Sequence, residues 1–199
     1  MGVVRVREDR LWGKPCLGYS VQARFDEAGI ARLTELQTRI AALPPRPRLH
    51  WTPPATMHIS LFSVIPVRWA DEGKEELWEQ LRDKVLNAVA SSEWLGALTV
   101  RFHELVITNT ALILSTPNQP EPIRRLRARL NAIVVAASLP SQDFDRTHMT
   151  LARPSCDDLL DERWVGGIEH FPVNVEAGIV SIVPIRESVY PTLEYELLT

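Results

Sequence analysis

The sequence predicts an α+β protein with two similar lobes. Segments with the alternating apolar pattern of strands are interspersed, along all 199 residues, with segments whose apolar residues recur every three or four positions, as in helices. Two short segments, MHISLF at 57–62 and THMTLA at 147–152, share one pattern and head comparable halves of the chain. The length suits one large domain or two small lobes that share a core, so we expect a single two-lobed domain over residues 1–199.

The first half of the chain reads as strand, helix, strand and helix. Residues 16–25 have the apolar spacing of a strand, and Asp26 then offers a cap for a helix whose apolar residues recur up to Leu43. Pro44 and Pro45 end this helix. The remaining segments are, in order, a proline-rich surface loop up to Pro54, a strand at 57–67 and an amphipathic helix at 71–90.

The second half has a similar order. Strands are predicted at 98–107 and 111–116, on either side of the turn-prone residues 108–110. A helix then starts near Asn118 and carries an apolar stripe as far as Ala137. The remaining segments are, in order, a strand at 147–153, a short helix at 157–164, a break at Gly166-Gly167, and strands at 173–185 and 189–198 that are joined around Arg186-Glu187-Ser188.

The two similar segments place a histidine and a hydroxyl side by side. Residues i and i+2 of a strand face the same side, roughly 6.5 to 7 Å apart. His58 and Ser60 therefore share one face of the first segment, and His148 and Thr150 share one face of the second, opposite apolar neighbours. Each segment thus presents an imidazole and a hydroxyl together.

Two imidazoles that face one cleft are able to divide acid-base chemistry between them. With an ordinary pKa near 6.5, one is neutral and takes a proton while the other is charged and gives one. The neighbouring hydroxyls then hydrogen-bond the non-bridging oxygens of a phosphate group. This set of residues is suited to in-line phosphodiester chemistry without a metal.

MHISLF and THMTLAR resemble the two signature motifs of the 2H phosphoesterase superfamily, which includes the RNA 2',5'-ligase-like cyclic phosphodiesterases. Residues 16–40 resemble the opening strand and helix of that family, and residues 179–198 resemble its closing hairpin. The resemblance implies a bilobal α+β fold in which two antiparallel sheets flank a central cleft, with helices on the outside and a pseudo-two-fold relation between the lobes.

The resemblance also implies roles for five residues. It assigns catalysis to His58 and His148, phosphate binding to the hydroxyls of Ser60 and Thr150, and a phosphate or nucleotide contact to Arg153. Strand parity places Arg153 opposite His148 unless the chain twists or bends there. Ser60 stands where threonine is frequent in the family, a change that retains the hydroxyl.

Other interpretations of the histidines remain open at this point. His50-Trp51-Thr52 also fits H-x-[ST], but it lies between prolines and is not expected to present a strand face. His58 and His148 are alternatively strand histidines with no catalytic role. A metal site would need further ligands near both, whereas Asp143 and Asp145 precede only His148. No metal site is therefore predicted.

Charge and composition limit the partners. A net charge of -3 and a pI near 6.0 give no global attraction to long nucleic acids or anionic membranes, so phosphate recognition must be local. The dense basic run RRLRAR at 124–129 is either an RNA-backbone contact or a solvated helix face. The lone cysteines Cys16 and Cys156 are expected to be reduced thiols.

These observations predict a cytoplasmic, monomeric enzyme with no membrane span, since no run approaches 18 apolar residues and the start lacks the apolar run of a secretory signal. The sequence has no phosphate-binding GxxxxGK[ST], dinucleotide-binding GxGxxG or hydrolase GxSxG pattern, and no cofactor is expected. The predicted activity is metal-independent hydrolysis of 2',3'-cyclic or 2'-5' phosphodiesters in nucleotides or RNA ends. The alternative is a module that binds a nucleotide or RNA phosphate in the same cleft without turnover.

Overall fold

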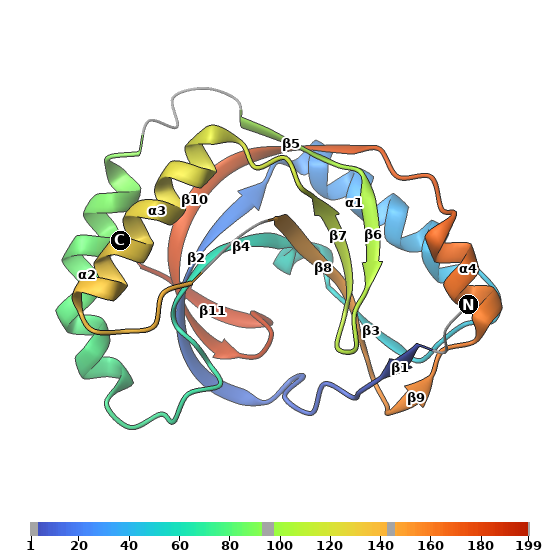
Figure 1. Cartoon of the computed structure of the whole chain (residues 1–199), viewed down its shortest axis with the longest axis horizontal. Coiled ribbons are helices and arrows are strands. Elements are labelled where there is room, and N and C mark those ends of the chain that lie inside the picture. Colours follow the sequence, from blue (N-terminus) through green and yellow to red (C-terminus); the bar gives the residue numbers. More distant parts are fainter. Residues whose placement is uncertain (1–3, 93–97, 143–145, 199) are drawn as a thin grey trace.

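Antiparallel sheets form the centre of the molecule, and helices lie on its two outer sides (Figure 1). The computed structural model describes residues 4–92, 98–142 and 146–198. The four helices are α1 (Glu27–Ala41), α2 (Lys74–Ala90), α3 (Glu121–Ala136) and α4 (Glu162–Glu169). In Figure 1, α2 and α3 cover one side and α1 and α4 the other. The predicted two-lobed α+β architecture is confirmed.

One sheet is organised around a long strand, β10. Its strand order is β11-β10-β2-β4, and β5 also pairs with β10, with every pair antiparallel. The strands are β2 (Pro15–Phe25), β4 (His58–Ile65), β5 (Leu98–Phe102), β10 (Val175–Val189) and β11 (Glu194–Leu197). This sheet carries the first histidine segment on β4, at the end of the strand order.

The second sheet carries the other histidine segment, on β8. Its order is β3-β8-β7-β6, again antiparallel throughout. The strands are β3 (Leu49–Trp51), β6 (Glu104–Ile107), β7 (Leu112–Thr116) and β8 (Thr147–Pro154), and a separate small pair joins β1 (Arg5–Val6) to β9 (Asp158–Leu159). A single turn of 3-10 helix (Pro54–Thr56) leads into β4.

The chain passes from one sheet to the other at His103. A single strand was predicted over 98–107, but β5 pairs with β10 in the first sheet and β6 pairs with β7 in the second. Phe102 is fully buried while His103 is exposed, and the His103 N–H donates to the Ser115 carbonyl, 3.1 Å away. The prediction was wrong because an apolar pattern continues across a change of sheet.

Three predictions near the C-terminus also need correction. The turn expected at Arg186-Glu187-Ser188 lies at 190–193, because β10 continues to Val189 and pairs with both β2 and β11 there. The short helix predicted at 157–164 is shifted, since α4 begins only after its cap, Asp161. The predicted break at Gly166-Gly167 falls within α4. Burial of Trp164, Val165 and Ile168 outweighs the low helix propensity of glycine, about 1 kcal/mol per residue.

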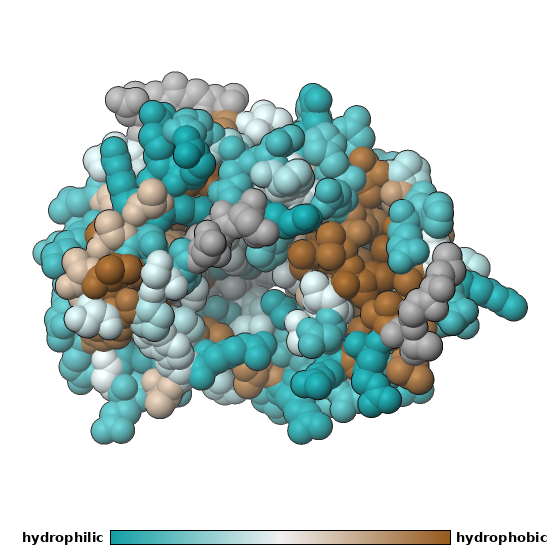
Figure 2. All heavy atoms as spheres, in the orientation of Figure 1, coloured by the Kyte–Doolittle hydropathy of each residue, from teal (hydrophilic) through white to brown (hydrophobic). Residues whose placement is uncertain are grey.

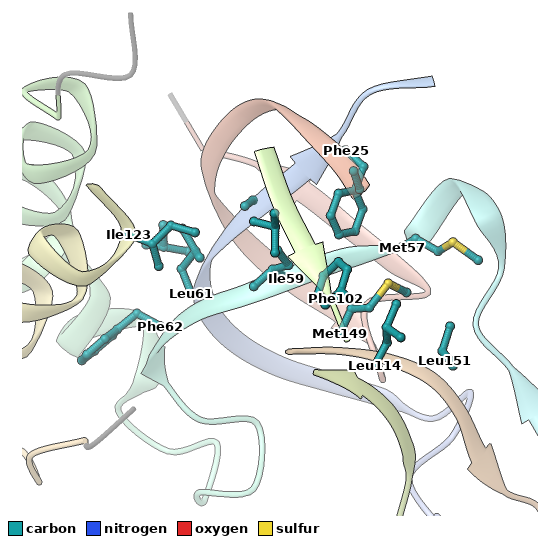
Figure 3. Packing of buried hydrophobic residues seen from close by; sticks show 14 of the residues in the cluster. Phe25, Met57, Ile59, Leu61, Phe62, Phe102, Leu114, Ile123, Met149 and Leu151 are labelled. Carbon is teal, nitrogen blue, oxygen red and sulfur yellow. The ribbon is translucent and has the colours of Figure 1, made fainter. Parts of the chain in front are cut away.

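Side chains from both sheets meet in one hydrophobic cluster (Figure 3). Ile59 of β4 and Met149 of β8 point toward the space that Phe102 and Leu114 also occupy, and all four are at most 1% exposed. Each apolar neighbour of a motif histidine is therefore fixed in the core. The histidines themselves must face the opposite side of their strands.

The outer surface is mixed. Figure 2 shows polar residues over much of the visible face and an apolar area on the side where α4 and β6 lie in Figure 1. The three apolar residues of β6, at 105–107, are half-buried. Within the described ranges, no helix is both long and apolar enough to span a membrane.

Candidate active site

The two motif strands show the predicted alternation. On β4, Ile59 is buried, as is Met57 just before the strand, while His58 is half-buried and Ser60 is exposed. On β8, Met149 and Leu151 are buried while His148 and Thr150 are half-buried. Each strand thus turns its imidazole and its hydroxyl away from the core, as expected from the sequence.

A β-bulge follows the hydroxyl residue of the first motif. Ser60 pairs with Gln22, but Phe62 already pairs with Val21, so β4 contains one residue more than its partner strand. The extra residue is Leu61. A bulge of this kind bends the strand and interrupts its alternation. As a result, Leu61 and Phe62 are both fully buried.

The second motif has a bulge at the same position. Thr150 pairs with Ile113 and Ala152 pairs with Leu112, so Leu151 is the extra residue on β8. Leu151 and Ala152 are again both fully buried. The two motifs are therefore alike in backbone geometry as well as in sequence, with one inserted residue directly after the hydroxyl.

The bulge decides where Arg153 points. Uninterrupted parity places Arg153 opposite His148 and Thr150, but one inserted residue reverses the parity, and Arg153 lines the same pocket as Thr150. Its Nη1 lies 3.0 Å from Oδ2 of the buried Asp9, and its guanidinium carbon lies 5.2 Å from the Tyr190 ring centroid. Within the described part of the chain, the buried Arg153 Nε has no hydrogen-bond partner.

A pocket of about 110 Å³ lies where the two motif strands approach each other. Its lining from the motifs consists of His58, Ser60, Thr150 and Arg153. The rest comes from the end of β3 and from the β10–β11 hairpin, namely Thr52, Glu187, Tyr190, Pro191 and Thr192. His148 is not in direct contact with this pocket, but its charge acts on His58, so the two rings lie within electrostatic range of each other.

The hydrogen bonds of His58 define its tautomer. Nδ1 lies 2.7 Å from the Thr56 carbonyl oxygen, which only accepts, so Nδ1 carries the hydrogen. In the neutral ring Nε2 is then an acceptor, and it lies 3.1 Å from Ser60 Oγ. The first motif therefore directs a nitrogen lone pair toward the hydroxyl at the pocket.

The surroundings of His58 favour its neutral form. Burial lowers the pKa of the imidazole to about 4; the hydrogen bond to Thr56 opposes this shift, and the charges of Arg24, Arg153 and His148 add to it. The ring is consequently neutral at pH 7. A neutral ring is the protonation state that a proton acceptor needs.

Buried side chains from two helices hold the bulges. Arg127 of α3, 4% exposed, donates from Nε to the Leu61 carbonyl at 2.9 Å and from Nη1 to the Arg146 carbonyl at 2.9 Å, just before β8. Gln37 of α1, 8% exposed, donates from Nε2 to the Leu151 carbonyl at 2.9 Å. Each bulge residue therefore has its carbonyl oxygen bound by a helix side chain.

Two sequence-based interpretations are corrected by these contacts. The run at 124–129 was weighed as an RNA contact or a solvated face; Arg124, Arg125 and Arg129 are exposed, whereas Arg127 is buried against both motif strands. His50-Trp51-Thr52 was not expected to present a strand face, yet β3 pairs with β8. Thr52 follows that strand, lines the pocket and donates from Oγ1 to the Thr150 carbonyl at 2.9 Å.

Sequence reasoning missed several of the residues around the pocket, and only some had a signal. Arg127 and Gln37 occupy positions on the apolar stripes of their helices, where a polar residue indicates a buried partner. Glu187 and Thr192 had no such signal, because they reach the pocket through pairing of β10 with β2 and β11.

No group of three or more His, Cys, Asp or Glu side chains suited to a metal ion occurs among the residues described. Asp143 and Asp145 lie outside the described residues. Cys16 and Cys156 are unpaired, and burial raises the pKa of Cys16 to about 11, with the charge of Glu187 adding to the shift. The absence of a metal from the reaction stays a prediction.

Solved structures of other proteins share this architecture. E. coli LigT complexed with 3'-AMP is 12% identical over 94% of this chain and 96% of that chain, with a TM-score of 0.58. The protein TT0787 of Thermus thermophilus is 17% identical over 92% and 95%, also with a TM-score of 0.58. A structure described as a phosphoesterase is 13% identical over 94% and 97%, with a TM-score of 0.60. No family model and no curated protein sequence matches the chain.

The chain therefore has the two-lobed α+β fold of LigT. The similarity extends over nearly the whole of both chains, so the fold implied by the resemblance to 2H phosphoesterases is confirmed. At identities this low, the comparisons establish the fold alone.

The contacts of Arg127 predict a large effect on stability. Arg127→Met should lower the free energy of unfolding by at least about 2 kcal/mol, because buried carbonyl groups lose a charged donor. Arg125→Met, on the exposed part of the same helix, should change it by less than about 0.5 kcal/mol. Urea denaturation of both variants measures the difference. Similar values for the two variants would contradict the role assigned to the buried guanidinium.

The lowered pKa of His58 predicts a specific pH dependence of stability. Between pH 6.5 and about 4 the unfolded chain binds a proton at this position that the folded chain does not, so stability falls as the pH falls. Relative to His58→Gln, the wild type should lose about 2 kcal/mol between pH 7 and pH 5.

Denaturation of both proteins across this pH range measures the loss. His103→Gln, which replaces an exposed histidine, serves as the control and should follow the wild type. If the wild type and His58→Gln keep a constant difference in stability, the pKa of His58 is not lowered.

Proposed function

We propose that this protein is a phosphoesterase that hydrolyses 2',3'-cyclic or 2'-5' phosphodiesters of nucleotides or RNA ends, with His58 and His148 as its acid-base pair. The observation that supports the proposal is the pair of equivalent bulged strands: His58, Ser60 and Thr150 line one pocket, and His148 lies outside its lining but within electrostatic range of His58. The shared fold with LigT, which has been crystallised with 3'-AMP and with ATP, supports a nucleotide as ligand.

The geometry supports His58 as the base. Its Nε2 lone pair accepts a proton from water as the water oxygen bonds to phosphorus. His148, in its protonated form, then gives a proton to the ribose oxygen as the bond from that oxygen to phosphorus breaks. Overall, one phosphodiester and one water are converted to one phosphomonoester and one free hydroxyl group. Both histidines then return to their starting protonation states by proton exchange with solvent.

The remaining polar groups suit the phosphoryl oxygens. The hydroxyls of Ser60 and Thr150 line the pocket from different strands, and the guanidinium of Arg153 lines it as well. Hydrogen bonds of this kind stabilise the charge that builds up on the oxygens in the transition state. The five residues that the sequence predicted are therefore all proposed as functional here.

The volume of the pocket limits what it encloses. At about 110 Å³ it is well below the roughly 300 to 1,000 Å³ of sites that enclose a small-molecule ligand. It suits a phosphate group with part of a ribose. The base, or a longer nucleic acid, would then lie outside the pocket, which agrees with recognition centred on the phosphate.

The acid-base assignment predicts a loss of turnover in two variants. His58→Ala and His148→Ala should each lower kcat/KM for 2',3'-cyclic AMP by at least about a hundredfold, in buffer that contains EDTA. His103→Ala, at an exposed position, should keep wild-type activity. Near-normal turnover in both motif variants would remove the assignment, and saturable binding without any product would identify a binding module instead.

The pH at which kcat/KM declines on the acidic side of its pH profile tests which histidine is the base. Since the pKa of His58 is lowered to about 4, kcat/KM should stay nearly constant as the pH falls from 7 to 5 and decline only near pH 4. A decline centred near pH 6.5 would point to an unperturbed imidazole as the base. Rates measured at low substrate concentration across pH 4 to 9 give this profile.

A further inference from the structure

The pocket contains a buried carboxylate that the reaction above does not use. Glu187 of β10 is 8% exposed and lines the pocket together with Ser60, Thr150 and Arg153. A carboxylate repels a phosphate group, so its place beside phosphate-binding hydroxyls requires an explanation. That explanation rests on the proposed function, since the ligand considered is the phosphate of that substrate.

Burial raises the pKa of Glu187, and a chain of hydrogen bonds opposes this shift by favouring the anion. Arg24 Nη1 donates to Gln22 Oε1 at 3.2 Å, and Gln22 Nε2 donates to Thr192 Oγ1 at 3.2 Å. The Thr192 hydroxyl, having accepted that bond, is left to donate to Glu187, and the Thr192 backbone N–H donates to Glu187 Oε1. Every donor in the chain points toward the carboxylate, which is the arrangement that an ionised acid requires.

The arginine that lines the pocket already has a carboxylate partner other than Glu187. Arg153 lies 3.0 Å from the carboxylate of Asp9, which is 6% exposed. Arg24 is engaged with the Tyr195 hydroxyl and the Ala55 carbonyl, and it stacks on the Tyr195 ring. His58 is neutral at pH 7. Glu187 therefore adds a negative charge beyond the one that offsets Arg153.

We propose that Glu187 makes the pocket discriminate by charge, admitting phosphodiesters, which carry one negative charge, and disfavouring phosphomonoesters, which carry two. The second ionisation of a phosphomonoester has a pKa near 6, so a hydrolysed product is a dianion at neutral pH. The additional charge is repelled by the nearby carboxylate in a site partly shielded from water. Cleavage then weakens binding, and the product leaves without inhibiting the enzyme.

Glu187→Gln removes the charge and keeps the shape. The amide oxygen of glutamine still accepts the Thr192 N–H, so the hairpin is retained. Adenosine 2'-phosphate and its methyl ester form a matched pair of ligands that differ by one charge. At pH 8, the variant should bind the phosphate at least tenfold more tightly than the wild type, with less than a threefold change for the methyl ester, as measured by calorimetry.

The control is Glu194→Gln, which removes an exposed carboxylate from the same hairpin and should change neither affinity. In the wild type, lowering the pH to 5 should also bring the two affinities together, because the phosphomonoester is then a monoanion. Equal changes for both ligands in Glu187→Gln, or no change for either, would overturn the charge discrimination.

The experiment separates this inference from the proposed activity when both proteins carry His148→Ala, because the methyl ester, itself a phosphodiester, is then bound without turnover. If the protein discriminates between the two ligands but hydrolyses no diester, the charge discrimination is supported and the proposed activity is overturned. If the protein hydrolyses diesters but the ratio of its affinities for the two ligands is the same in the wild type and in Glu187→Gln, only the charge discrimination is overturned. Binding of neither ligand to either protein overturns the inference as well.

Discussion

The candidate site depends on two buried backbone carbonyl groups that accept hydrogen bonds from helix side chains. Each belongs to a bulge residue, Leu61 or Leu151, and each is bound by a buried side chain from a helix. The Leu151 carbonyl also accepts the Thr52 backbone N–H at 2.9 Å, so Gln37 is a second donor there, whereas the guanidinium of Arg127 is the donor at Leu61. Because an unsatisfied buried carbonyl is costly, these donors stabilise the bulges. The bulge in turn decides which side of the strand is faced by the hydroxyl before it and by the side chains after it.

Arg127 has the larger part in this arrangement because it contacts both motif strands. One guanidinium binds the Leu61 carbonyl on β4 and the Arg146 carbonyl that precedes β8, and it also donates to the Gln119 side chain at 2.7 Å. The strands belong to different sheets. A single buried cation on α3 therefore sets the position of one motif relative to the other, which is the relation that acid-base catalysis by two histidines requires.

The sequence was sufficient for what depends on local pattern. Alternation around His58 and His148 predicted both strands and the sides that they turn outward, and helical spacing predicted three of the four helices closely. It was not sufficient where residues distant in the sequence decide the outcome. The position of Arg153 depends on an inserted residue that only strand pairing reveals, and Glu187 was assigned to a turn because nothing in its neighbourhood shows that β10 continues.

The crossing at His103 limits how the two lobes move. One residue separates β5, in the first sheet, from β6, in the second, and a single hydrophobic cluster includes side chains from both sheets. A hinge requires a connector that absorbs large changes in backbone angle, and one residue between two paired strands leaves little room for them. The recess between the motifs is therefore preformed, and a ligand would enter it by diffusion, without closure of one lobe over the other.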